Sequence, residues 1–106
     1  MLDAPGSMND EYRLLTEIDR ARQAQEITEH PLFVEAMEKY KTRLMDEWAA
    51  SPARDKEGRE HLWLMVKTVS VVEGHLKELM QTGKLATIQL EQKKSVRDRL
   101  MSWSGL

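Results

Sequence analysis

The feature that most constrains the fold is the spacing of six apolar residues between positions 62 and 79. Leu62, Met65, Val69, Val72, Leu76 and Leu79 follow one another at intervals of 3, 4, 3, 4 and 3 residues. Because two turns of an α-helix take about seven residues, this spacing places all six side chains on one face of a helix. Trp63, Val66 and Met80 lie beside this face and widen it beyond the stripe of a two-stranded coiled coil. The sequence therefore predicts more than one neighbouring helix.

A second helix is predicted upstream by the same kind of spacing. Phe33, Met37, Tyr40, Leu44 and Trp48 follow at intervals of 4, 3, 4 and 4 residues. Pro31 suits the first turn of this helix and disfavours helical geometry at His30, so we expect a break there. Before the break, a weaker stripe through Leu14, Ile18 and Ala21 predicts a further helix.

The breaks between these patterns predict helices at about 9–29, 32–50, 55–82 and 84–103, and hence an all-α fold. Ser51 and Pro52 interrupt the pattern, and Asp55 restarts it because its carboxylate can accept hydrogen bonds from the free amides of a first turn. Gly83 has two interpretations, which both stay open. It can cap one helix at its C-terminus, or it can occupy a seam position in a helix that continues to the tail.

These elements predict a long antiparallel helical hairpin that resembles a coiled coil. Two helices cannot surround so wide an apolar face, so something else must cover it. The cover is either the same chain, folded back at Pro31 and Gly83 into a bundle, or other copies of the chain. We favour completion of the bundle by oligomerisation. Residues 9–106 are expected to form one helical domain, and residues 1–8 either a native flexible leader or the remnant of a tag.

No combination of residues predicts catalysis, a metal site or a cofactor. The chain has no cysteine, so thiolate ligands and thiol nucleophiles are absent. His61 and His75 share a helix face but stand about 21 Å apart along the axis, too far to bind one metal ion. The glycines do not have the spacing of a phosphate-binding loop. We therefore expect a protein that is not an enzyme.

Charge is distributed unevenly along the chain. Residues 83–106 contain five basic and two acidic side chains, a net charge of +3, which leaves −5 for residues 1–82. A basic amphipathic tail of this kind can meet an acidic protein surface or the phosphates of a nucleic acid, and tryptophan is frequent at binding hot spots. The candidate partner-binding residues are Lys93, Lys94, Arg97, Arg99, Leu100 and Trp103.

No apolar run is long enough to span a bilayer, so we expect a soluble cytoplasmic protein without a membrane partner. Three blocks of the sequence, HPLFVEAMEKYKTRLMDEW, SPARDKEGREHLWLMVKTVSVVEGHL and TGKLA, resemble small, mostly uncharacterised helical proteins encoded in the virion gene clusters of tailed bacteriophages and prophages. The resemblance covers about residues 18–90. It implies an accessory role in phage assembly or infection, in the host-cell cytoplasm or the virion, and it assigns no functional residue.

Three hypotheses about function remain, of which an enzyme is the least favoured. The first is a non-enzymatic interaction or assembly protein that forms a homo-oligomer through its apolar seam and binds a larger protein through its tail. The second is a small nucleic-acid or nucleotide binding protein, including a phage factor that sequesters a host signal. It would use the basic C-terminal helix or a pocket between subunits.

Overall fold

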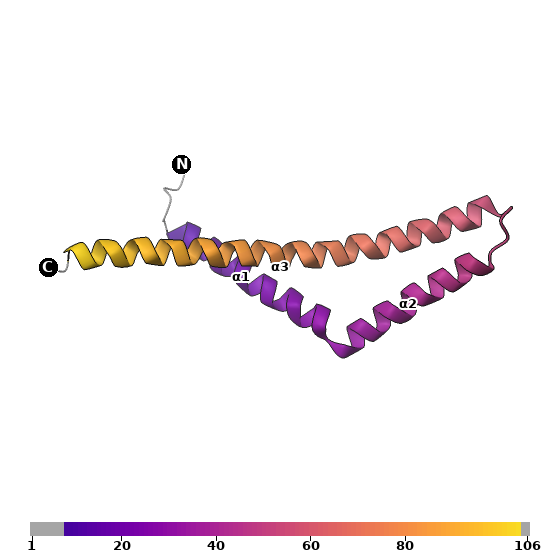
Figure 1. Cartoon of the computed structure of the whole chain (residues 1–106), viewed down its shortest axis with the longest axis horizontal. Coiled ribbons are helices and arrows are strands. Elements are labelled where there is room, and N and C mark those ends of the chain that lie inside the picture. Colours follow the sequence, from indigo (N-terminus) through magenta and orange to yellow (C-terminus); the bar gives the residue numbers. More distant parts are fainter. Residues whose placement is uncertain (1–7, 105–106) are drawn as a thin grey trace. The chain divides into compact units, whose positions relative to one another are not determined.

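The computed structural model describes residues 8–104, and these residues form three α-helices and no strand (Figure 1). Helix α1 spans Met8–Glu29, α2 spans Pro31–Ala50 and α3 spans Lys56–Ser104. The all-α prediction is confirmed. The predicted leader falls mostly on residues 1–7, which lie outside the described residues, whereas Met8 already belongs to α1.

The boundary between α1 and α2 follows from the pair His30 and Pro31. His30 has an extended backbone, and its Nδ1 accepts a hydrogen bond from the Leu32 amide at 3.1 Å. Pro31 occupies the start of α2, where the missing amide hydrogen leaves no helical hydrogen bond unmade. The break expected at His30 is present, and His30 acts as the N-cap of α2.

The turn between α2 and α3 is closed by side chains at both ends. The Ser51 hydroxyl donates to the Trp48 carbonyl oxygen at 2.6 Å, which satisfies a free carbonyl of the last turn of α2. At the start of α3, the Gly58 amide donates to Asp55 Oδ1 at 3.1 Å. Asp55 therefore has the capping role that the sequence predicted for it.

Helix α3 continues through Gly83 without interruption and contains 49 residues. The two helices expected at 55–82 and 84–103 are one helix, so Gly83 is not a C-cap. The reason for a glycine here is the close approach of α1. A Cβ atom placed on Gly83 would overlap the Cβ of Ala21 and lie 3.1 Å from the Glu17 carbonyl oxygen.

The described chain divides into two compact units, and the single helical domain over 9–106 stays a prediction. Of the described residues, the first unit contains those up to Ala24 and those from Glu78 onward, and the second contains Gln25–Lys77. Helix α3 is long enough to contribute one segment to each unit. It packs on α1 in the first unit and on α2 in the second.

The core of each unit is small. Among the described residues, the buried apolar side chains are Leu14, Ala24 and Ala86 in the first unit and Leu44 in the second. Gly83 is also buried, consistent with tight packing between α1 and α3. In the second unit the Lys41 ammonium lies 2.8 Å from a Glu73 carboxylate oxygen, and Arg59 contacts Ser51 and Trp48. Residues near the end of α2 thus contact residues near the start of α3, and Lys41, earlier in α2, contacts Glu73, later in α3.

Candidate interaction surface

The predicted seam lies mainly in the second unit, and much of it is only half-buried. Leu44 is 2% exposed, whereas Val72 of α3 is 52% exposed and Trp48 of α2 is 43% exposed. Tyr40 is also exposed, and the other seam residues have intermediate burial: Phe33, Met37, Leu62, Met65, Val69, Leu76 and, in the first unit, Leu79. Packing α2 on α3 therefore covers one side of the seam and leaves another open.

Both tryptophans of the second unit lie beneath a cation. The Arg59 guanidinium carbon stands 4.1 Å from the centre of the Trp48 ring, and the Lys67 ammonium 5.2 Å from that of Trp63. The Arg59 guanidinium also donates to the Ser51 hydroxyl at 2.9 Å and to the Ser51 carbonyl oxygen at 3.1 Å. Arg59 thereby fixes the turn and one face of Trp48 together, which holds an exposed aromatic ring in place.

A small hollow of about 230 Å³ lies between the helices of the second unit. Its apolar wall includes Phe33, Met37 and Leu76, and the ion pair between Lys41 and Glu73 stands at its edge. Thr28, Val34, Glu38 and Lys77 complete the lining. A hollow with an apolar wall and charged edges suits an apolar side chain from a partner better than a charged ligand.

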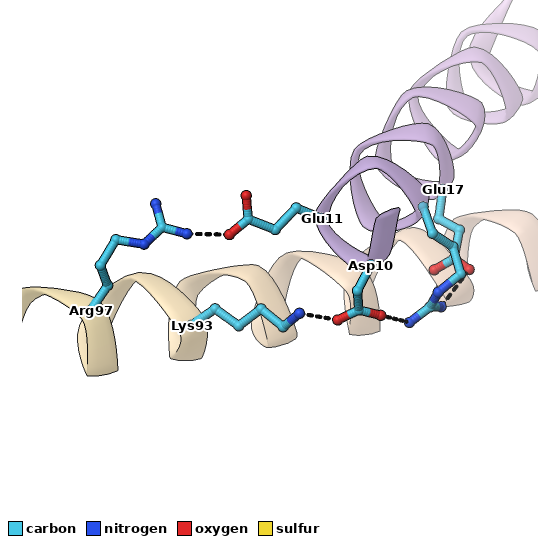
Figure 2. A network of polar contacts seen from close by, with 6 residues as sticks. Asp10, Glu11, Glu17, Lys93 and Arg97 are labelled. Atoms are coloured by element: carbon cyan, nitrogen blue, oxygen red, sulfur yellow. Dashed lines mark hydrogen bonds and ion pairs between the residues drawn. The ribbon is translucent and has the colours of Figure 1, made fainter. Parts of the chain in front are cut away.

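The first unit contains ion pairs that the sequence analysis did not anticipate. Lys93 of α3 pairs with Asp10 of α1, and Arg97 pairs with Glu11 (Figure 2). Asp10 is shared with Arg13, whose guanidinium lies 2.8 Å from it and also 3.0 Å from Glu17. Two of the four candidate cations of the tail are therefore neutralised by the start of α1.

The other two candidate cations, Lys94 and Arg99, have no hydrogen bond or ion pair within the described chain. They line a shallow surface depression on α3 together with Glu91 and Asp98. The structure thus separates the four predicted basic residues into a paired set that faces α1 and an unpaired set elsewhere on α3. Acidic neighbours reduce the positive potential at both places.

The apolar candidates of the tail are widely exposed. Leu100 is 63% exposed and Trp103 is 79% exposed. Leu100 lines a groove of about 540 Å³, whose other lining residues are Glu11, Gln89, Gln92, Lys93, Val96 and Arg97. Val96, which the sequence analysis did not select, lies in this groove and is itself exposed.

The histidines that the sequence analysis considered lie at the surface of the helices. His61 and His75 are exposed, and His30 is engaged as an N-cap. Within residues 8–104, no group of three or more His, Asp or Glu side chains could hold a metal ion. Hydrogen bonds from Arg22 and then Gln23 lower the pKa of Asp19, an exposed surface residue of α1.

The sequence analysis assigned no role at the candidate surface to Asp10, Glu11 or Val96. Asp10 and Glu11 stand in the first turn of α1, where carboxylates are ordinary because they complement the helix dipole. Their pairing with the tail joins residues separated by 83 and 86 positions, so no local pattern could have indicated it. Val96 lies at helical spacing from the candidates Leu100 and Trp103, and this spacing was sufficient to place it beside them.

Comparison with known proteins finds no matching family, no matching curated protein and no matching solved structure. Among the helices described, none is both long and apolar enough to cross a membrane.

Proposed function

We propose that this protein is a non-enzymatic interaction protein that works as a homo-oligomer. In this proposal α2 and α3 form a long antiparallel hairpin, and further copies complete it into a bundle. One observation carries the proposal. The apolar seam that dominates the sequence is only partly covered within the chain, with Val72 and Trp48 about half exposed.

The energetic argument concerns the large apolar side chains that remain in water. Val71 is 71% exposed, Leu64 50% and Trp63 53%, in addition to the seam residues. Full burial of such a side chain stabilises a protein by about 1.5–3 kcal/mol. Single exposed apolar residues are normal, but Leu64 and Val71 lie two turns apart on the same side of α3, and exposed apolar side chains that share a helix face are typical of an interface. Self-association would cover these side chains without requiring any other molecule.

The role that we propose for the oligomer is assembly with a larger protein. The resemblance to proteins of virion gene clusters supports an accessory or assembly function in a tailed phage. The exposed ring of Trp63 supports contacts with another protein, since tryptophan is enriched where binding energy is concentrated.

Nucleic-acid binding is the competing hypothesis, and the ion pairs of the first unit weigh against it. Lys93 and Arg97 would have to leave Asp10 and Glu11 before they could contact phosphates. A nucleic-acid surface normally presents cations that are free to displace counterions. The remaining unpaired cations of the tail share their surface with Glu91 and Asp98.

The experiment that tests the proposed function combines thermal unfolding with a binding assay. For a homo-oligomer, the unfolding temperature rises with protein concentration, because association stabilises the folded state by mass action. We expect this rise, and we expect no salt-sensitive change in the fluorescence anisotropy of labelled DNA or RNA. An unfolding temperature independent of concentration would contradict the proposal. Binding to nucleic acid that weakens steeply with salt would favour the competing hypothesis.

A further inference from the structure

The last part of α3 carries an apolar face, interrupted by one glutamine, that the first unit leaves uncovered. Its residues, here called the tail stripe, are Leu85, Ile88, Val96, Leu100 and Trp103, with Gln92 in the middle. They follow at helical spacing and therefore share one face. All five apolar members are exposed, from 44% for Ile88 to 79% for Trp103.

The tail stripe lies beside α1 and is distinct from the face that packs on α1. Buried Gly83 and Ala86 mark the packed face of α3, and Leu85 between them is 61% exposed. The groove that contains Val96 and Leu100 is bounded on one side by Glu11 of α1. The cations at this edge, Lys93 and Arg97, are already neutralised by Asp10 and Glu11, so they do not prevent the approach of a similar surface (Figure 2).

The exposed area supports a second copy of the chain as the occupant. The chain exposes 8900 Å², whereas a folded monomer of 12.3 kDa exposes about 6100 Å² by the usual relation between surface and mass. The excess per chain is on the order of 2000–3000 Å², whereas each partner of an obligate homodimer buries roughly 1000–2500 Å², so the chain exposes enough surface to accept a second copy.

Charge complementarity favours an antiparallel arrangement of two copies. Glu91 and Arg99 line the same depression, stand four residues on either side of Ser95, and have no polar partner in the described chain. A two-fold axis near Ser95 and Val96 brings each Glu91 close to the Arg99 of the other copy. The same register places Ile88 of one copy against Trp103 of the other, and Val96 of one copy against Val96 of the other. A parallel arrangement would instead place Arg99 beside Arg99, which is unfavourable.

We propose that the tail stripe is a self-association surface, on which a second copy packs its own tail stripe in antiparallel orientation. The two copies then form a four-helix arrangement of two α1 helices and two α3 tails. This inference deepens the proposed homo-oligomer and rests on it. It assigns the tail stripe to binding a second copy of this chain, and not to binding a larger protein.

Disulfide trapping tests the orientation, because the chain contains no cysteine of its own. Val96→Cys lies near the two-fold axis and should form a disulfide-linked dimer on mild oxidation. Ile88→Cys alone and Trp103→Cys alone should not, since each would be about 22 Å from its counterpart along the helix axis. A mixture of these two variants should form a mixed disulfide. Equal trapping of all three single variants would indicate a parallel pair and overturn the proposal.

Charge exchange tests the specific contact between Glu91 and Arg99. We expect Glu91→Arg and Arg99→Glu each to raise the dissociation constant of the dimer by about tenfold or more, as measured by sedimentation. The double variant should return it to within about threefold of the original value, because the pair is restored with opposite sense. Lys94→Glu is the matched control. It removes the other unpaired cation of the same depression, which lies outside the tail stripe and has no acidic counterpart in the proposed register, and should change the dissociation constant little.

The possible failures are distinguishable from one another. A wild-type chain that stays monomeric at every concentration overturns both the proposed homo-oligomer and this inference. An oligomer that ignores both charge variants and shows no trapping through Val96→Cys leaves the homo-oligomer in place and overturns only the tail stripe as its interface. Circular dichroism of each variant checks that helicity is retained.

Discussion

At the scale of single residues, Gly83 is the position where the packing of α1 on α3 leaves the least room. Alanine has a higher helix propensity than glycine by about 1 kcal/mol, so an exposed helical glycine is normally improved by this change. At Gly83 the added methyl would overlap Ala21 and approach the Glu17 carbonyl oxygen at 3.1 Å. Overpacking of this kind costs about 1–3 kcal/mol.

We therefore predict that Gly83→Ala lowers the free energy of unfolding, as measured by urea denaturation. Gly74→Ala is the control, because a Cβ at that position of the same helix meets no atom within 4 Å. It should raise the free energy of unfolding by up to about 1 kcal/mol. A stabilising Gly83→Ala would mean that α1 does not approach α3 at this point.

Asp19 offers a residue-scale prediction about pH. Its carboxylate accepts hydrogen bonds from Arg22 at 2.8 Å and from Gln23 at 2.8 Å, which lower its pKa. A carboxyl with a lowered folded-state pKa contributes stability above its unfolded pKa, and this contribution is lost as the pH falls through the folded-state value. Titration followed by NMR should give Asp19 a pKa below that of an ordinary aspartate. Arg22→Gln should raise the pKa, and an unchanged value in this variant would show that the pair does not persist in solution.

At the scale of elements, α1 is held on α3 by very few buried side chains. Leu14 is fully buried, and it neighbours Leu15, which is 53% exposed on the same helix. We predict that Leu14→Ala lowers the free energy of unfolding by about 2–5 kcal/mol through loss of burial and cavity formation. Leu15→Ala should cost much less. Hydrogen exchange of the α1 amides provides the measurement, and equal effects of the two changes would show that Leu14 does not anchor the helix.

The same elements show what the sequence could and could not predict. The helix boundaries at His30 and Asp55 were predictable, because capping and proline geometry depend on neighbouring residues. The continuity of α3 was not, because the role of Gly83 depends on Ala21, which is remote in sequence. The pairing of Lys93 and Arg97 with α1 was hidden for the same reason. The seam was recognised as an apolar face, but spacing alone does not tell which of its residues stay exposed in one chain.

At the scale of the whole molecule, we infer that one chain does not complete its own hydrophobic core. Each compact unit buries few large apolar side chains, and both leave apolar helix faces in water. In the first unit the open face is the tail stripe, and in the second it includes Val71 and Val72. A chain with open apolar faces in both units can form a closed dimer or a larger assembly, according to how many of these faces are used.

The mass of the protein in solution, measured by multi-angle light scattering over a wide range of concentrations, tests this claim most directly. At micromolar concentration we expect a mass of at least two chains, a whole-number multiple of 12.3 kDa. The oligomer should dissociate only on strong dilution. A mass of 12.3 kDa at every concentration, with native helicity and cooperative unfolding, would contradict it.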